Sequence, residues 1–345
     1  EAELARVLAA VVQPGALRHA LRPIGAAATP QARQVAAGFV ARGGWRPDES
    51  SVFFTGNGRQ AIAAALRALA APGERIGVEA LTYPPLKGMA RQLGITLVPL
   101  DLDEQGLMPG ALLAAHRAAP LSGVYLQPSL HNPLGCTMDA ERRQQVAAAL
   151  AQTGLVAIED AIHGFLVDEL PLAAYAPDRV ILVDSLSKRI APGLTLGFAL
   201  APPALAERLA SAVRAGAVAA AGLPLAAGLQ LMSSGAAARI ARLKRRDAAA
   251  RQAIARQALS GLEWVGDPRA YHLWLKLPGG WRAETFVVAA ARQGIAVAPG
   301  SAFAVATGHA PNTVRIALSA PPRDDLRAAL QRLRRLVEEG DADID

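Results

Sequence analysis

Short runs of strand-type apolar residues alternate with alanine-rich helical stretches over the first two thirds of this chain of 345 residues. Several runs are continuously apolar, which is typical of strands that are covered on both faces. Regular alternation of strand and helix favours a largely parallel sheet. The predicted strands cover residues 51–55, 75–79, 96–100, 123–127, 155–159, 180–184 and 195–200. The sequence therefore predicts an α/β fold around a seven-stranded, mostly parallel sheet.

The last third of the chain has a different pattern, with long helices and fewer, alternating strands. We expect helices over 236–259, 283–292 and 323–338, and strands over 271–277, 295–298 and 313–318. These elements indicate a smaller α+β unit. The predicted organisation is an N-terminal helical segment (1–45), a large domain (46–235) and a small C-terminal domain (236–345).

Composition excludes several classes of protein. A content of 52% hydrophobic residues excludes a disordered chain. The net charge of +7 permits anionic partners but does not identify one. The single cysteine, Cys136, excludes a disulfide framework and a multi-thiolate zinc site, so we predict no metal and a reducing, cytoplasmic location. Residues 215–238 carry no charge, but their alanine and glycine content and Pro224 favour a buried or interface segment over a membrane span. The chain starts at Glu1, not Met, which indicates a processed protein or a piece of a longer one.

A glycine-containing turn at residues 55–61 (Thr-Gly-Asn-Gly-Arg-Gln-Ala) follows one predicted strand and opens a helix. Backbone amides at a helix N-terminus bind anions, so the turn predicts a phosphate site. Taken alone, Gly56 and Gly58 also fit a dinucleotide-binding turn, with Glu79 placed to meet a ribose. A plain strand–helix turn is the third interpretation.

Three polar residues each follow a different predicted strand. Lys188 comes after the strand 180–184, Asp160 ends the strand before it, and Asn132 follows the strand 123–127. A partly desolvated lysine can form an imine, and a buried carboxylate can hold a pyridinium nitrogen protonated. Carboxyl ends of parallel strands meet at one edge of a sheet, so we expect the three side chains to converge there.

These motifs resemble those of the fold-type I pyridoxal-phosphate aminotransferase family along nearly the whole chain. Residues 132–135 (Asn-Pro-Leu-Gly) are similar to the family's Asn-Pro-Thr-Gly, and residues 185–188 with Pro192-Gly193 are similar to its lysine segment. More narrowly, residues 272–278, 82–84 and 159–160 resemble the aminotransferase-like domain of MocR regulators. Those regulators are a branch of the GntR family that joins a winged helix to this fold.

The resemblance implies pyridoxal 5'-phosphate (PLP) as cofactor, with a role for each matching residue. Lys188 would form the aldimine, Asp160 would pair with the ring nitrogen, and Asn132 and His163 would meet the ring hydroxyl. Tyr83 would stack on the ring. The residues expected around the phosphate are Gly58, Arg59, Ser185, Ser187 and Thr195, and the one expected to bind a substrate carboxylate is Arg315.

Departures from the family pattern affect the same site. Thr195 stands where relatives have the arginine that neutralises the phosphate, and we expect Arg59 or Arg189 to compensate. Losing that contact costs about 1.5–3 kcal/mol of binding free energy if nothing replaces it. His163 replaces a tyrosine and Leu134 replaces the threonine of the Asn-Pro-Thr-Gly turn, which argues against efficient transamination.

Three functions remain open from the sequence. The first is the effector-sensing and dimerising domain of a MocR-type regulator, in which an amino compound with a carboxylate forms an aldimine with PLP. Its DNA contacts would belong to an N-terminal winged helix outside this sequence. The second is a free-standing PLP-dependent aminotransferase acting on an amino acid. The third is a nicotinamide enzyme, which leaves Lys188, Asn132 and Arg315 without a role.

Overall fold

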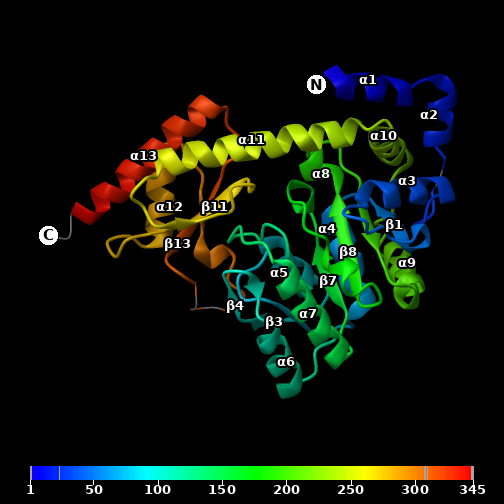
Figure 1. Cartoon of the computed structure of the whole chain (residues 1–345), viewed down its shortest axis with the longest axis horizontal. Coiled ribbons are helices and arrows are strands. Elements are labelled where there is room, and N and C mark those ends of the chain that lie inside the picture. Colours follow the sequence, from blue (N-terminus) through cyan, green and yellow to red (C-terminus); the bar gives the residue numbers. More distant parts are fainter. Residues whose placement is uncertain (1, 23, 307, 309, 343–345) are drawn as a thin grey trace.

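A seven-stranded sheet forms the centre of the computed structural model, which describes residues 2–22, 24–306, 308 and 310–342 (Figure 1). The strand order is β1-β9-β8-β7-β6-β2-β3. All neighbouring pairs are parallel except the two that β9 makes with β1 and β8, so β9 alone runs against the rest. The strands are β1 (Val52–Thr55), β2 (Arg75–Glu79), β3 (Thr96–Leu100), β6 (Gly123–Leu126), β7 (Ala157–Asp160), β8 (Val180–Ser185) and β9 (Gly197–Leu200).

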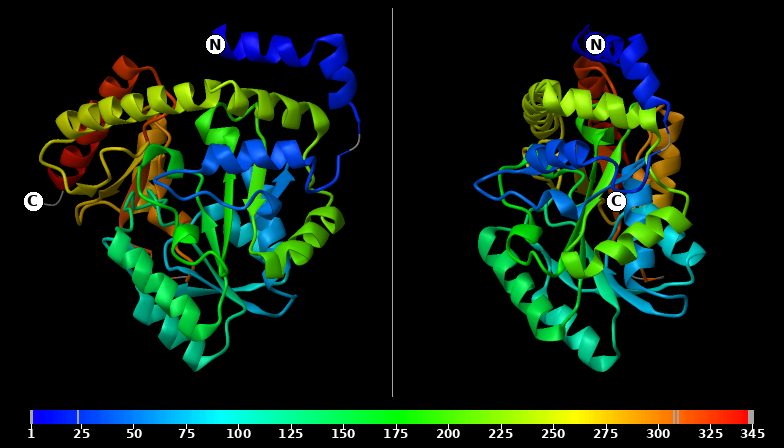
Figure 2. Two further views of the ribbon diagram at one scale, coloured as in Figure 1. Left: turned by 45° about the vertical axis from the view of Figure 1, so that its right-hand side comes forward. Right: turned by 90° about the vertical axis from the view of Figure 1, so that its right-hand side faces the viewer.

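Helices cover both faces of this sheet, as Figure 2 shows. Alternate strand residues point to opposite faces, so Leu182 joins one apolar core and Ile181 joins the other. The first core contains residues of α3 (Pro30–Val40), α6 (Pro109–Ala118), α7 (Ala140–Thr153) and α10 (Gly222–Ser233). The second contains residues of α4 (Gly58–Leu69), α5 (Pro84–Gln92) and α9 (Ala206–Ala215). A two-stranded hairpin, β4 (Leu102–Asp103) and β5 (Gly106–Leu107), follows β3.

A second, antiparallel sheet forms the small part of the molecule. Its strand order is β10-β11-β13-β12, with bounds Trp264–Val265, His272–Lys276, Thr313–Ala317 and Ala298–Pro299 in that order. A separate apolar core joins this sheet to α12 (Ala283–Arg292), α13 (Arg323–Ala342) and the end of α11 (Ala236–Ala258).

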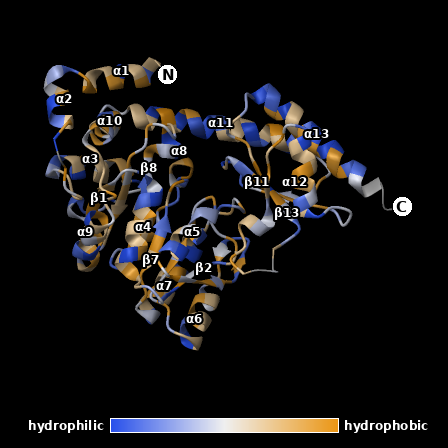
Figure 3. Cartoon of the chain, turned by 180° about the vertical axis from the view of Figure 1, so that it is seen from behind, coloured by the Kyte–Doolittle hydropathy of each residue, from blue (hydrophilic) through white to orange (hydrophobic). Residues whose placement is uncertain are grey.

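Helix α11 connects the two parts, as Figure 1 shows. Its first residues, Ala236 and Ala237, belong to the core of the large sheet, whereas Ile254 and Ala258 belong to that of the small sheet. Seen from behind in Figure 3, α11 and α13 carry both hydrophilic and hydrophobic residues along their length. This pattern is typical of helices that lie on the surface with one face packed.

The N-terminal helices α1 (Ala2–Val11) and α2 (Pro14–Ala20) pack against α10, the helix formed by the uncharged segment. A Cβ at Gly222 would lie 1.9 Å from the carbonyl oxygen of Ala20, so glycine is required where α2 crosses the start of α10. Among the described residues, no helix is long and apolar enough to cross a membrane.

The predicted fold class is confirmed, with differences in detail. The strand expected at 295–298 is only Ala298–Pro299, and that expected at 195–200 begins at Gly197. Helices α6 and α10 and the β4–β5 hairpin were not predicted. The remaining elements are short turns of 3₁₀-helix: η1 (Glu49–Ser51), η2 (Gly164–Leu166), η3 (Leu172–Ala174), η4 (Pro203–Leu205) and η5 (Gly300–Ala302). The domain boundaries at 45 and 235 stay a prediction.

Candidate functional site

Lys188 lies on a one-turn helix, α8 (Leu186–Arg189), directly after β8. Burial lowers the pKa of Lys188, and the positive charges of Arg315 and Arg59 lower it further. The ammonium group of Lys244, on α11, donates to the carbonyl oxygens of Lys188 (2.6 Å) and Ile190 (2.9 Å). The segment that carries Lys188 is thus tied to α11, and its amine has a larger neutral, nucleophilic fraction than an exposed lysine.

Asp160 ends β7, beside β8, and is buried. The hydroxyl of Tyr125, on β6, donates to Asp160 Oδ2 at 2.6 Å, and the backbone N–H of Ile162 donates to Oδ1 at 3.2 Å. Burial raises the pKa of Asp160 to about 6, although both hydrogen bonds favour the carboxylate. The carboxylate is therefore fixed in orientation and is still able to take up a proton near neutral pH.

Asn132 and Arg315 contact each other across the two parts of the molecule. Arg315 Nη1, on β13, donates to Asn132 Oδ1 at 3.1 Å. Because Oδ1 is the acceptor, the amide nitrogen of Asn132 keeps its hydrogens for another partner. The guanidinium of Arg315 also lies over the ring of Phe303, with Cζ 5.3 Å from the centroid. Its Nε is buried and has no hydrogen-bond partner among the described residues.

The start of α4 approaches the end of β8 closely. A Cβ on Gly58, the first residue of α4, would lie 3.3 Å from Ser185 Oγ. Asn57 caps the helix by accepting from the N–H of Gln60 at 3.0 Å. Arg59 Nε donates to the hydroxyl of Tyr83 at 3.0 Å. The helix N-terminus, a serine hydroxyl and an exposed guanidinium therefore lie near one another, an arrangement that suits an anion.

Ser187 and Thr195 are hydrogen-bonded to each other, with their hydroxyl oxygens 2.5 Å apart. Arg189 is directed elsewhere: its Nη2 lies 2.5 Å from Asp184 Oδ2, and its guanidinium stacks on Phe39 and Phe165. Asp184 and Leu182 lie on the face of β8 opposite Ser185. The expectation that Arg189 compensates for Thr195 is therefore wrong, because Asp184 already pairs with it on the other face of the sheet.

Three histidines, His131, His163 and His272, lie close to one another. The rings of His163 and His272 are 5.6 Å apart, and His272 Nε2 lies 2.9 Å from the carbonyl oxygen of His131. Burial lowers the pKa of His163 to about 3 and that of His272 to about 4, and the nearby positive charges of Lys188 and Arg315 lower both further. His131 Nε2 lies 3.1 Å from Glu79 Oε2. At neutral pH the rings of His163 and His272 are therefore uncharged.

Glu79 does not have the position that a ribose-binding carboxylate needs. Its side chain is fully buried, and Oε2 accepts from the N–H of Gln127 at 3.0 Å. The dinucleotide interpretation of the turn at 55–61 is wrong for this reason. Among the described residues, no group of three or more acidic, histidine or cysteine side chains is placed to hold a metal ion.

Sequence reasoning missed three contacts of this site, made by Tyr125, Lys244 and His272. Tyr125 could have been found, because it lies in the strand next to Asp160 and a tyrosine buried in an apolar run needs a hydrogen-bond partner. Lys244 and His272 reach the site from elements distant in sequence. Their approach depends on how α11 and the small sheet pack, for which local sequence gives no signal.

Comparisons with known proteins identify the family of this chain. The family model for aminotransferase class I and II matches residues 20–333. The HTH-type transcriptional regulator YdeF of Bacillus subtilis is 31% identical over 310 residues, which cover 89% of this chain and 67% of YdeF. The pyridoxine biosynthesis regulator PdxR of Corynebacterium glutamicum is 32% identical over 168 residues, 48% of this chain and 36% of PdxR.

Among solved structures, the α-aminoadipate aminotransferase LysN of Thermus thermophilus has the same fold. The TM-score is 0.88 at 22% identity, over 99% of this chain and 89% of LysN. The expected resemblance to PLP-dependent aminotransferases and to regulators with such a domain is confirmed. The chain belongs to the aminotransferase class I and II family, and this membership together with the fold implies that its cofactor is pyridoxal 5'-phosphate.

Proposed function

We propose that this chain is the ligand-sensing domain of a transcriptional regulator, which holds PLP at Lys188 and recognises an amino compound bearing a carboxylate. The observation that carries the proposal is that Arg315 both hydrogen-bonds to Asn132 and lowers the pKa of Lys188, beside the strand that Asp160 ends, in a chain whose relatives include regulators. The chain covers about two thirds of YdeF, so the regulatory activity of a whole protein is part of the proposal.

The donor set around Lys188 fits PLP. The cofactor supplies an aldehyde that condenses reversibly with amines and a ring that withdraws electrons. Lys188, with its lowered pKa, provides the amine. Asp160, fixed by Tyr125, provides the acceptor for a protonated ring nitrogen, and the unused amide hydrogens of Asn132 provide donors for a phenolate oxygen.

The phosphate would lie at the start of α4, among Gly58, Arg59 and Ser185. The backbone N–H groups of the helix N-terminus and the guanidinium of Arg59 are the donors for it. Ser187 and Thr195 contribute hydroxyls that already bond to each other. Arg59 is therefore the cation that would balance the phosphate in place of the residue that Thr195 replaces.

Arg315 is the proposed contact for the carboxylate of the ligand. Its buried, unpartnered Nε and its position over Phe303 leave a planar donor edge for two carboxylate oxygens. His163 would meet the ring hydroxyl as a neutral imidazole, because its pKa is lowered to about 3.

Sensing requires that the ligand favours one of two conformations, and it does not require turnover. An amino ligand that competes with Lys188 for the aldehyde changes what this side chain contacts. Lys188 is joined through its carbonyl oxygen to Lys244 on α11, the helix that connects both sheets. A change in the contacts of Lys188 can therefore be transmitted through α11 to both the large and the small sheet.

A free-standing aminotransferase is the second candidate, favoured by the fold shared with LysN. In that case the amine of Lys188 would also move the α-proton of the substrate. Thr195 and His163, in place of the arginine and tyrosine expected from the family, argue against it.

The proposal includes a homodimer in the cytoplasm, with DNA contacts made by a winged helix outside this sequence. Three apolar side chains are exposed: Val12, between α1 and α2, at 55%; Leu21, directly after α2, at 70%; and Leu223, on α10, at 42%. Exposed apolar side chains on these elements, which pack against one another, suit a subunit contact.

The decisive experiment uses the fact that the sequence contains only four lysines: Lys87, Lys188, Lys244 and Lys276. The chain is incubated with PLP, reduced with borohydride and mapped by mass spectrometry. We expect a yellow protein with the adduct on Lys188 alone, and loss of the adduct in Lys188→Ala but not in Lys276→Ala.

A panel of amino acids, polyamines and amino sulfonates should then change the absorbance of the PLP-loaded protein. We expect a carboxylate-bearing compound to do so without sustained consumption. Many turnovers with 2-oxoglutarate would favour the enzyme, and an adduct spread over several lysines would contradict both functions.

A further inference from the structure

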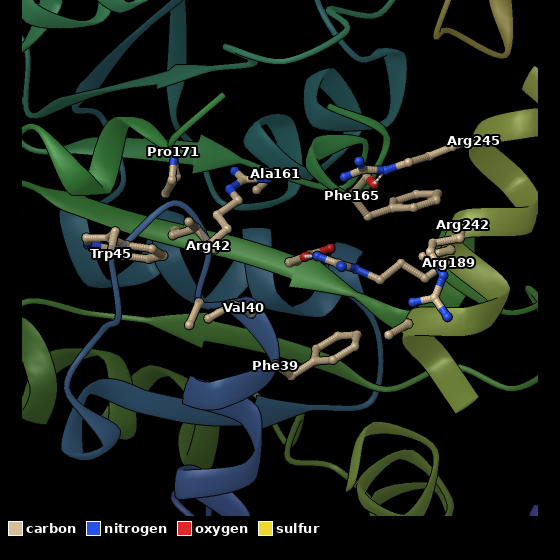
Figure 4. Close-up of a pocket in the computed structure, with 15 residues that line it drawn as sticks. Phe39, Val40, Arg42, Trp45, Ala161, Phe165, Pro171, Arg189, Arg242 and Arg245 are labelled. Carbon is tan, nitrogen blue, oxygen red and sulfur yellow. Dashed lines mark hydrogen bonds and ion pairs between the residues drawn. The ribbon is translucent and has the colours of Figure 1, made fainter. Parts of the chain in front are cut away.

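A pocket of about 280 Å³ lies on the face of the large sheet opposite α4 (Figure 4). Its walls come from the end of α3 and the loop after it, from β8, α8 and η2, and from the first half of α11. The charged residues that line it are Arg42, Asp184, Arg189, Arg242 and Arg245. This pocket therefore has four guanidinium groups and one carboxylate.

Two of the four arginines have ion-pair partners. Arg189 pairs with Asp184, and Arg245 Nη1 lies 2.5 Å from Asp168, while its other nitrogens donate to backbone carbonyls. Arg42 and Arg242 form no ion pair with any residue that the structure describes; Arg42 makes a single hydrogen bond, to the carbonyl oxygen of Gly164. The carboxylates of Glu159 and Asp184 attract Arg42, but Glu159 also lies 3.8 Å from Arg143 Nη1 and Asp184 pairs with Arg189. The pocket therefore keeps more positive than negative charge.

Buried donors in the pocket also lack partners. The Nε–H groups of Arg42 and Arg189 are buried and have no acceptor among residues 2–22, 24–306, 308 and 310–342. The side chain of Arg189 is only 11% exposed. Buried donors without acceptors are uncommon in native proteins and call for an acceptor. Figure 4 shows the side chains of Arg42, Arg189 and Arg245 directed toward the same space from three elements.

Aromatic rings form part of the wall. Cζ of Arg189 lies 4.7 Å from the centroid of Phe39 and 5.4 Å from that of Phe165. Rings on either side hold a guanidinium in place and keep water away from it, so its attraction for an anion is stronger than at an exposed surface.

We propose that this pocket binds a small organic dianion, a phosphate monoester or a dicarboxylate. The guanidinium groups of Arg42 and Arg242, which form no ion pair with the described residues, match two negative charges, and the planar arginine fork binds carboxylate and phosphate through two hydrogen bonds. Asp184 and Arg189, which line the pocket, are direct chain neighbours of Ser185 and Lys188 of the PLP site. The dianion site and the PLP site therefore lie on either side of one short segment.

The test is calorimetric titration of the full chain with inorganic phosphate and, separately, with succinate, at one fixed ionic strength. We expect saturable binding of at least one probe, and a dissociation constant raised on the order of tenfold by Arg242→Gln and by Arg42→Gln. Binding of phosphate alone identifies the ligand class as phosphate esters, and binding of succinate alone identifies it as dicarboxylates.

Arg246→Gln is the matched control, because Arg246 is exposed on the same helix and does not line the pocket. Arg59→Gln tests the other site. The proposal is overturned if neither probe binds, if Arg242→Gln binds as the unmodified chain does, or if Arg59→Gln alone abolishes binding. Arg242 is exposed and makes no hydrogen bond with the described residues, so its replacement leaves the fold intact.

Discussion

Arg315, on β13 of the small sheet, and Asn132, in the turn after β6 of the large sheet, are joined by a hydrogen bond of 3.1 Å from Nη1 to Oδ1. This contact closes the Lys188 site between the large and small parts of the molecule. It also orients the Asn132 amide, since the oxygen faces the arginine. One side chain of the small sheet thus affects both the proposed cofactor contact and the proposed ligand contact.

Replacing Arg315 with lysine tests its proposed role. A lysine keeps the charge but cannot bind a carboxylate with two parallel hydrogen bonds, so we expect ligand affinity to fall by about 10- to 100-fold. PLP affinity should change much less. Spectral titration of the PLP-loaded protein measures both, and Arg292→Lys, at an exposed position on α12, is the control. Equal affinity in Arg315→Lys would contradict the carboxylate contact.

Thr195→Arg restores the residue that the family pattern has at this position. The side chain is partly exposed, so an arginine has room, and a charge-assisted hydrogen bond to phosphate contributes about 1.5–3 kcal/mol. We expect PLP to bind about tenfold tighter or more. Thr195→Val, which only removes the hydrogen bond to Ser187, should give no gain. Unchanged PLP affinity in the arginine variant would place the phosphate elsewhere.

Gly197, the first residue of β9, is required by a close approach. A Cβ there would lie 2.3 Å from the backbone carbonyl of Asn57, the residue that caps α4. We expect Gly197→Ala to lower the free energy of unfolding by about 1–3 kcal/mol and to weaken PLP binding, because the start of α4 must move. Gly193→Ala, at a glycine whose Cβ would meet nothing within 4 Å, is the comparison. Urea denaturation distinguishes them, and equal stability would refute the argument.

The buried His272 predicts a particular pH dependence. Its pKa is lowered to about 4, below the ordinary 6.5, so the folded chain takes up this proton less readily than the unfolded chain. Its contribution to stability is complete above pH 6.5 and is lost as the pH falls toward 4. By pH 4.5 we expect the unmodified chain to lose about 2 kcal/mol more than His272→Gln.

Urea denaturation at pH 7 and pH 4.5 measures this difference. Asp160, with a pKa raised to about 6, has the opposite effect over the same range, but it is present in both proteins and cancels in the comparison. The exposed His19→Gln should behave as the unmodified chain does. Parallel pH profiles for His272→Gln and the unmodified chain would contradict the lowered pKa.

The parallel order of strands and the convergence of Lys188, Asp160 and Asn132 could be predicted from the sequence. Each of these residues follows a strand, and parallel strands bring their carboxyl ends to one edge. The direction of β9 could not be predicted, because a short apolar run has the same pattern whichever way it runs.

Side-chain direction on the short helix α8 was also beyond the sequence. Lys188 and Arg189 are neighbours, yet Arg189 turns to Asp184 and to two phenylalanine rings on the other face of the sheet. The two rings come from α3 and η2, which are remote along the chain. Only their packing decides which cation remains near the start of α4.

Helix α11 has 23 residues, which gives it a length of about 34 Å. It contains neither proline nor glycine, the residues at which helices commonly kink. Such a rod transmits rotation instead of absorbing it. A tilt of the small sheet by a ligand at Arg315 would turn the opposite end of the rod, beneath α10 and the N-terminal helices. The same rotation would move the Lys244 ammonium, which is hydrogen-bonded to the carbonyl oxygen of Lys188. Ligand binding at the site and the orientation of the N-terminal helices would then change together.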